Sequence, residues 1–326
     1  MKLKTQPQVL DHMLAINLDI NIWSARRKLN PEYFSHGTLP PEQLASLGSK
    51  KICDPKELKI FGTLKSRAVS LLDKTGVRFL GGWAIPDDRS GYINSELQVI
   101  ADEFEAAKSA FMTNYDSAVQ SWIKSNPGWE KVISSSVVDA SYVSSRIAFN
   151  WQTFRVASPT ATDTKLQTGL HCEVENLGGT LFDEIAKVAR DAMNKTYMGK
   201  KEVTRKALSP LKTIQSKLSG LSFIEPRVLP VSALIKSAID MLPNRGGIRG
   251  TDLLMLQGLV SLLMHPAAIT NYAQEIIDGR SNENVLGSLV QADRTTTTKA
   301  IKEMPSEEQA DSGPQPTPQL ESHGLW

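Results

Sequence analysis

The chain has 326 residues, 40% of them hydrophobic and 22% charged, as expected for a globular protein of one large domain or two ordinary ones. Aromatic residues make up only 6%, which disfavours a β-sandwich and suits a helical protein built on aliphatic side chains. Cys53 and Cys172 form no CxxC pair, so the sequence excludes a disulfide framework and favours a reducing cytoplasm.

The net charge of +2 is unevenly distributed along the chain. Residues 281–326 contain seven acidic and three basic side chains, which leaves residues 1–280 with a net charge of +6. A mildly basic body permits contact with nucleic acid without requiring it. No signal peptide is expected, because Asn17 and Asp19 interrupt the early apolar run. The most apolar segment, 253–264, is far shorter than the roughly 20 residues that span a bilayer, so it predicts a buried helix.

The first predicted element is a β-strand. Between residues 16 and 22, four aliphatic side chains alternate with Asn17, Asp19 and Asn21, a period of two that gives a strand one apolar and one polar face. Residues 23–29 lose the alternation and predict a basic helical turn. The best pairing partner for the strand is 76–86, GVRFLGGWAIP, in which a Gly pair marks a turn or a bulge.

Helices are predicted for most of the remaining chain. Asp54 and Pro55 are typical of a helix start, and this helix is expected to run to Asp73 before Gly76 ends it. Apolar residues spaced by three or four predict a long helix over 93–123. A second long helical region is predicted over 180–218, with possible breaks at Gly199 and Pro210. Each of these helical regions has a row of apolar side chains along one face. The simplest way to bury the two rows is against each other, in a long antiparallel, coiled-coil-like helical hairpin.

The segments around these helices complete the prediction. Residues 132–168 are expected to form shorter helices at the far end of the hairpin. Further helices are expected over 231–242, capped by Ser232, and over 252–277, broken near His265.

The predicted fold is therefore mainly α with a small α+β N-terminal part. The expected units are a head with a two-stranded β element (1–90), a helical arm (91–220), C-terminal helices (221–280) and a disordered acidic tail (281–326).

Two segments are candidates for contact with nucleic acid or another anion. The densest basic stretch of the chain could follow a phosphate backbone, or it could be a solvated helix face. The segment 244–252 is rich in Gly and opens a helix, whose N-terminal N–H groups can hold an anion. A plain cap by Thr251 or Asp252 explains this segment equally well, and it matches neither a Walker loop nor a dinucleotide fingerprint. The candidate residues are Lys195, Lys200, Lys201, Arg205, Lys206, Lys212 and Lys217 in the first segment, and Arg245 and Arg249 in the second.

The sequence predicts no catalytic residue, metal site or cofactor. His171, Cys172 and Glu173 have the chemistry of metal ligands, but no second cluster lies at a suitable spacing, and loop residues before a helix explain them. The motifs HExxH and GxSxG are absent.

Three segments resemble a known family: INLDINIWSARRKL at 16–29, LASLGSKKICDP at 44–55 and GVRFLGGWAIP at 76–86. They are similar to the signature segments of the bacterial domain of unknown function family 3150, and the resemblance extends over roughly the first 280 residues. The family has no established activity and no catalytic residues to carry over. Its genes occur on mobile elements, often beside a MoxR-type AAA+ ATPase and a von Willebrand A-type protein.

Two functions follow as hypotheses. The first is a non-enzymatic cytoplasmic scaffold or adaptor that associates with itself, with the AAA+ ATPase or with the von Willebrand A-type protein. The long apolar seam motivates it, since such arms mediate assembly. The second is a nucleic-acid-binding accessory of mobile-element DNA processing that uses the basic stretch. No membrane contact is expected.

Overall fold

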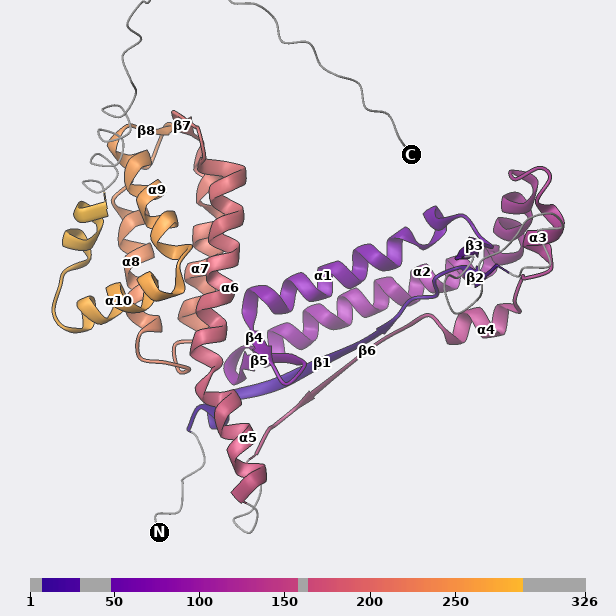
Figure 1. The fold of residues 1–326 in the computed structure, drawn as a ribbon, viewed down its shortest axis with the longest axis horizontal. Coiled ribbons are helices and arrows are strands. Elements are labelled where there is room, and N and C mark those ends of the chain that lie inside the picture. The colour runs from indigo at the N-terminus through magenta and orange to yellow at the C-terminus, as the bar shows by residue number, and fades with distance from the viewer. Residues whose placement is uncertain (1–7, 30–47, 158–163, 290–326) are drawn as a thin grey trace, which may run out of the picture.

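The computed structural model describes residues 8–29, 48–157 and 164–289. A bundle of helices forms one end of the molecule, and a long arm of helices and strands extends from it (Figure 1). We call residues 13–157 the arm and residues 164–289 the helical lobe. Buried residues form two clusters, one along the arm and one in the lobe. The mainly helical fold with a small sheet near the N-terminus is as predicted, but the sheet has four strands where two were expected.

A four-stranded antiparallel sheet runs along the arm in the order β4-β5-β1-β6. The central strand β1 (Met13–Asn21) pairs with β5 (Gly82–Pro86), which confirms the predicted partner. On its other side β1 pairs with β6 (Ala148–Phe154), and the short strand β4 (Val77–Phe79) extends the sheet beyond β5.

The predicted alternation along β1 is confirmed. Ile16 is fully buried and Leu18 is partly buried, whereas Asn17, Asp19 and Asn21 are exposed. The base of the sheet lies between the two cores, because Ile16 packs in the core of the arm while Met13 packs in the core of the lobe.

Two helices pack against the sheet to form the core of the arm. Asp54 caps a 3-10 turn by accepting a hydrogen bond from the Lys56 N–H at 2.9 Å. The helix α1 (Lys59–Thr75) continues from that turn two residues past the expected Asp73 and ends at Gly76, as predicted. The helix α2 (Ser90–Lys124) confirms the long helix predicted over 93–123. Phe104 of α2 contacts Phe61 of α1 and Phe149 of β6, with ring centroids 4.9 and 5.5 Å apart.

The predicted hairpin of two long helices is wrong. The apolar seam of α2 is buried against α1, β6 and the short helices of the arm. Residues 180–218 do not form one helix. The helix α6 (Leu177–Ala192) gives way to a π-helical turn, Gly199 turns the chain at a φ of 69°, and Pro210 lies in the first turn of α7 (Ser209–Gly220). The breaks predicted at Gly199 and Pro210 are therefore confirmed, because Gly adopts a positive φ readily and Pro fits the first turn of a helix.

The lobe is built from α6 and α7 with helices on either side. The predicted break at His265 is confirmed, and the apolar segment 253–264 is the buried helix expected. The elements of the lobe are α5 (Thr164–Glu175), α6, the π-helical turn η5 (Met193–Tyr197), β7 (Glu202–Val203), the 3-10 turn η6 (Arg205–Leu208), α7, α8 (Val228–Asp240), β8 (Ile248–Arg249), α9 (Thr251–Leu263), α10 (Pro266–Ile277) and a helical segment over 282–289.

Three local predictions are corrected at the ends of the molecule. Residues 26–28 form a strand, β2 (Arg26–Lys28), rather than a helical turn, and β2 pairs with β3 (Ser49–Lys51). The segment predicted as short helices contains α3 (Glu130–Ser134) and α4 (Ala140–Ser145), but it also supplies β6. Ser232 lies inside α8 instead of capping it, and its hydroxyl contacts that of Ser219 at 2.7 Å.

The two hydrophobic cores group the segments of the chain differently from the predicted domain boundaries. Residues 91–154 share a core with the first strands, while 177–220 share a core with the C-terminal helices. The predicted tail begins too early, because Val285 and Leu286 are buried in the lobe. The rest of the predicted tail, 290–326, lies outside the described residues.

Within the described parts of the chain, no single helix is long and apolar enough to cross a membrane. The pair α9 and α10 reaches that length and composition only together, and the two helices meet at a bend of 109°.

Candidate nucleic-acid interface

The basic stretch predicted on one helix is divided among short elements at one end of the lobe. Lys195 lies on η5, Lys200 and Lys201 lie in the following turn, and Lys206 lies on η6. Lys212 continues the series onto the exposed side of α7.

A two-residue strand pair brings the second candidate segment to the same place. Glu202 and Val203 of β7 pair with Arg249 and Ile248 of β8, beside each other at the end of the lobe (Figure 1). Arg205 reinforces the junction, because its guanidinium donates a hydrogen bond to the carbonyl oxygen of Pro243. The structure thereby gathers two basic segments that lie some distance apart in the sequence.

A cavity of about 410 Å³ continues the basic surface to the arm. Lys74 at the end of α1 faces Arg205 and Lys212 of the lobe across this cavity. Hydroxyl groups of Ser209 and Ser216 also line it, and no carboxylate does. Cations and hydroxyl groups arranged in this way suit a phosphate group.

We call this surface the basic strip. Most of its cations are exposed and have no hydrogen-bonding or ionic partner among the described residues. Lys195 is an exception, since Asp191 lies 3.5 Å from its ammonium in an exposed ion pair. The basic strip consists of Lys74, Lys195, Lys200, Lys201, Arg205, Lys206, Lys212, Arg245 and Arg249.

The basic strip offers cations rather than stacking surfaces. Tyr197, the aromatic residue in the basic stretch, is fully buried, and its hydroxyl donates a hydrogen bond to the Ala207 carbonyl at 2.6 Å. Burial raises the pKa of Tyr197 to about 12. Since Tyr197 cannot stack on a base, the strip suits contact with a phosphate backbone better than recognition of single-stranded bases.

The Gly-rich segment is not arranged as an anion site of its own. A Cβ added at Gly247 would overlap the carboxylate of Glu202, so a negative charge already lies against this backbone. The helix cap is Gly250, with a φ of 59° and no side-chain hydrogen bond, so the predicted cap by Thr251 or Asp252 is wrong. The short strand β8 lies within the segment, and the element that precedes the segment is the helix α8. We therefore assign Arg245 and Arg249 to the strip and no separate site to the loop.

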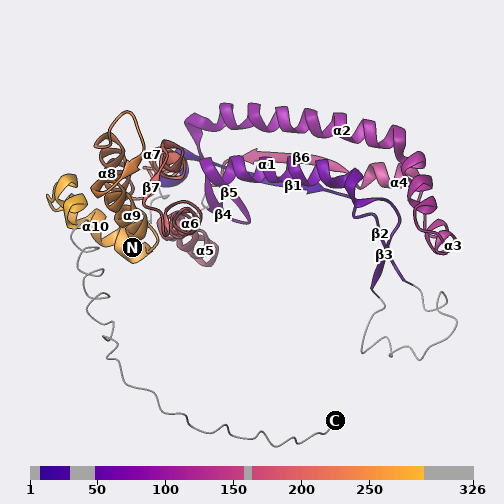
Figure 2. The same ribbon diagram turned by 90° about the horizontal axis from the view of Figure 1, so that it is seen from above.

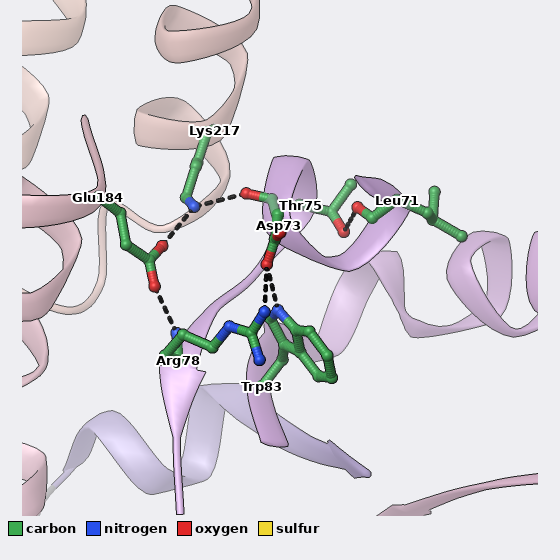
Figure 3. A network of polar contacts seen from close by, with 7 residues as sticks. All are labelled: Leu71, Asp73, Thr75, Arg78, Trp83, Glu184 and Lys217. Carbon is green, nitrogen blue, oxygen red and sulfur yellow. Dashed lines mark hydrogen bonds and ion pairs between the residues drawn. The ribbon is translucent and has the colours of Figure 1, made fainter. Parts of the chain in front are cut away.

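Lys217 does not lie on this surface but is buried at the junction between the lobe and the arm (Figure 3). Its side chain is only 6% exposed, and its ammonium donates hydrogen bonds at 2.6 Å to Glu184 of α6 and to the backbone carbonyl of Asp73 in α1. The other carboxylate oxygen of Glu184 accepts from the Arg78 N–H of β4 at 2.9 Å. Lys217 thus joins three elements, and we do not include it in the interface.

Asp73 extends this junction within the arm (Figure 3). Its carboxylate accepts hydrogen bonds from the Arg78 guanidinium at 3.0 Å and from the Trp83 indole at 2.8 Å. The Arg78 guanidinium also lies 3.8 Å from the centre of the Trp83 ring. These contacts hold the basic cavity at the end of α1 in place beside α7.

A second cavity at the junction, of about 600 Å³, is lined by ionisable groups of the N-terminal part of the chain and by hydroxyl-bearing residues of the lobe. Asp87 of the arm and His12, which directly precedes β1, line it together with Ser219 and Ser222 of the lobe. Asp87 accepts a hydrogen bond from Arg155 at 2.6 Å. Among the described residues, no Ser hydroxyl in this cavity is hydrogen-bonded to His12, as an activated nucleophile would be.

No metal-binding cluster of three or more His, Cys, Asp or Glu side chains occurs in the described parts of the chain. His171, Cys172 and Glu173 lie on α5, not in the loop predicted for them.

The two cysteines differ in environment, which gives a prediction for thiol labelling. Cys53 is buried, and burial raises its pKa to about 11, with the charge of Glu57 contributing, whereas Cys172 is exposed. A pKa two units above the ordinary value lowers the thiolate fraction about a hundredfold near neutral pH. We expect a thiol reagent to label one cysteine of the native protein and two after denaturation. Cys172→Ser should abolish the native labelling, and rapid labelling of that variant would contradict the burial of Cys53.

Comparison with known proteins places the chain in a family. No curated protein and no solved structure matches the chain. A family model described as a protein of unknown function, DUF3150, matches residues 10–265, which include the sheet, both long arm helices and most of the lobe. The chain therefore belongs to the DUF3150 family.

Proposed function

We propose that this protein is a nucleic-acid-binding accessory that holds the phosphate backbone of duplex DNA along the basic strip. The observation that carries the proposal is the pairing of β7 with β8, which gathers two basic segments at one surface. The setting in mobile-element DNA processing comes from the family resemblance alone.

The composition of the basic strip supports backbone contact without sequence recognition. Cations that neutralise phosphates release counterions, and this term supplies most of non-specific DNA binding. The hydroxyl-lined cavity beside Lys74 and Lys212 gives one phosphate a defined position, and it joins the end of α1 to the strip. Base-edge readout needs a helix or a two-stranded ribbon lying in a groove, and the β7–β8 pair of the strip is only two residues long in each strand.

The adaptor hypothesis is the second proposal. It rested on the apolar seam of the long helix, but Phe104, Phe111 and Tyr115 of that seam are buried within the arm. A seam covered by its own chain does not mediate assembly. An association with the AAA+ ATPase or the von Willebrand A-type protein would need another surface, and a pull-down with the purified partners tests it.

The test is duplex binding measured by fluorescence anisotropy at several salt concentrations. About six phosphate contacts predict an affinity that falls about a thousandfold between roughly 50 and 200 mM salt. Replacing Lys200, Lys201 and Lys206 with Glu should remove about three phosphate contacts. The affinity should fall strongly, and the slope of log affinity against log salt concentration should become shallower by about 3. Arg205 is left in place because it holds the Pro243 carbonyl.

A matched control changes the same charge elsewhere. Lys65 of α1, Lys187 of α6 and Lys236 of α8 are exposed and lie outside the strip, so replacing these three with Glu should weaken binding much less. Equal losses of affinity in the two triple variants would show that net charge alone drives binding. An affinity that does not depend on salt concentration would refute the proposal.

A further inference from the structure

The strands β2 and β3 form a cationic ribbon at the end of the arm far from the basic strip (Figure 2). Arg26 is paired opposite Lys51, and Arg27 is paired opposite Lys50. Like charges directly opposite each other destabilise an antiparallel pair. The Lys50 ammonium donates a hydrogen bond to the Val132 carbonyl at 2.6 Å. The facing charges of Arg26 and Lys51 are unfavourable in the isolated protein, and a bound polyanion would relieve them.

Contacts with the rest of the arm hold the ribbon in place. The Ile52 N–H donates a hydrogen bond to the Ala25 carbonyl at 2.9 Å, and the Trp122 indole donates to the Lys51 carbonyl at 3.1 Å. Ala25 adopts a φ of 53°, a left-handed conformation that costs about 1 kcal/mol for a residue other than Gly. This turn separates β2 from β1 and directs β2 into a ribbon of its own.

A cavity of about 240 Å³ lies at the base of the ribbon, and Arg26 and Lys51 both line it. Ser24 also lines the cavity, and none of its lining residues is acidic. The carboxylates of Asp54 and Glu57 line a neighbouring cavity beside Trp122 instead. Two cations on facing strands, with a serine lining the same cavity, suit one phosphate group.

Aromatic side chains accompany these cations. The Tyr142 ring is 39% exposed, and the guanidinium groups of Arg27 and Arg146 lie 5.4 and 5.2 Å from its centre. Trp129 beside α3 is 52% exposed. Guanidinium groups stacked on a ring are held with their donors in a fixed plane, which favours contact with phosphate oxygens.

We propose that the β2–β3 ribbon is a second contact with duplex DNA, in which Arg26 and Lys51 hold a backbone phosphate. A two-stranded ribbon has dimensions that fit a duplex groove. Because the ribbon and the basic strip lie at opposite ends of the molecule (Figure 1), one protein molecule joins two duplex segments. The ribbon contact stands on its own residues, whereas the joining of two segments rests on the proposed function of the strip.

The experiment measures single-duplex binding and bridging separately. One short duplex is fixed to beads and loaded with the full chain, and capture of a second duplex carrying a fluorophore is measured. We expect the wild-type protein to capture it. Arg26→Glu combined with Lys51→Glu should reduce capture at least tenfold and lower the salt slope of total binding by about 2, while single-duplex binding through the strip persists.

Controls separate a local effect from misfolding and from bulk charge. Lys65→Glu with Lys236→Glu makes the same charge change on exposed helix positions and should leave capture within about twofold of the wild type. Arg26→Gln with Lys51→Gln removes the cations without adding charge. It should also lower capture, while the thermal unfolding midpoint does not fall, because the repulsion between the facing cations is removed.

The outcomes distinguish the two proposals. Capture that survives both ribbon variants overturns the ribbon contact and leaves the strip intact. Single-duplex binding that is weakened but not abolished in the strip variant, together with loss of capture of the second duplex, supports both proposals. Mass measurement of the bridged complex completes the test, since two protein molecules per pair of duplexes would show bridging by a dimer and overturn the two-ended arrangement.

Discussion

Replacing Lys217 with Met is expected to lower the free energy of unfolding by about 3 kcal/mol. The substitution keeps most of the side-chain volume but removes the ammonium that Glu184 and the Asp73 carbonyl share. The loss falls at the low end of the range for broken buried ion pairs because Glu184 remains 23% exposed to water. Equilibrium unfolding in urea measures the change.

Lys212 provides a matched control on the same helix. It is exposed and has no ionic partner among the described residues, so Lys212→Met should change stability by about 0.5 kcal/mol or less. Equal effects at positions 212 and 217 would refute the assignment of Lys217 to the junction.

A double-mutant cycle identifies the partner of Lys217. Glu184→Gln removes the charge while retaining an acceptor for the Arg78 N–H. If the pair is coupled as the geometry indicates, Lys217→Met combined with Glu184→Gln should cost less than the two single changes added together, by about 1 kcal/mol or more. Additive effects would mean that Lys217 acts mainly through the Asp73 carbonyl.

Much of the arm could be predicted because its side-chain patterns are long. The strand over residues 16–22 and the helix over 93–123 each carry enough alternation or three-and-four spacing to determine their buried faces. The pattern of β6 was available too, since Phe149, Trp151 and Thr153 alternate with smaller or polar residues. The Ser-rich sequence before β6 favoured short helices, and α3 and α4 do form there.

The interface was harder to predict because it depends on pairings too short to show a pattern. Two residues each in β7 and β8 bring the basic segments together, and three each in β2 and β3 form the ribbon. Arg26, Arg27 and Lys28 have no alternation in polarity, so nothing in that tripeptide distinguishes a strand from a helical turn.

The burial of Lys217 did have a signal in the sequence. Lys217 follows Leu211 and Ile214 at intervals of three and directly precedes Leu218, so it falls on the buried face of α7. A lysine on an apolar helix face needs an acceptor, but the sequence does not show that Glu184 and Asp73 supply it from two other helices. The prediction that Lys217 belongs to the basic surface rested on its charge, whereas its position on the helix places it on the buried face.

Gly82 should be among the least replaceable residues of the sheet. A Cβ added at this position would lie 2.2 Å from the carbonyl oxygen of Ile16, a backbone atom of the central strand. Gly82→Ala must therefore move β5 away from β1, and we expect it to lower the free energy of unfolding by about 3 kcal/mol. Because β1 contributes Ile16 to the arm core and Met13 to the lobe core, the displacement weakens both.

Gly62 gives the opposite expectation for the same substitution. It lies exposed within α1, and a Cβ there would meet nothing within 4 Å. Gly62→Ala should raise the free energy of unfolding by about 0.5–1 kcal/mol, since Ala loses less backbone entropy than Gly in a helix. Thermal and urea unfolding of the two variants, made side by side, tests the register of β1 against β5. A stable Gly82→Ala protein would mean that the strands do not approach as closely as this register requires.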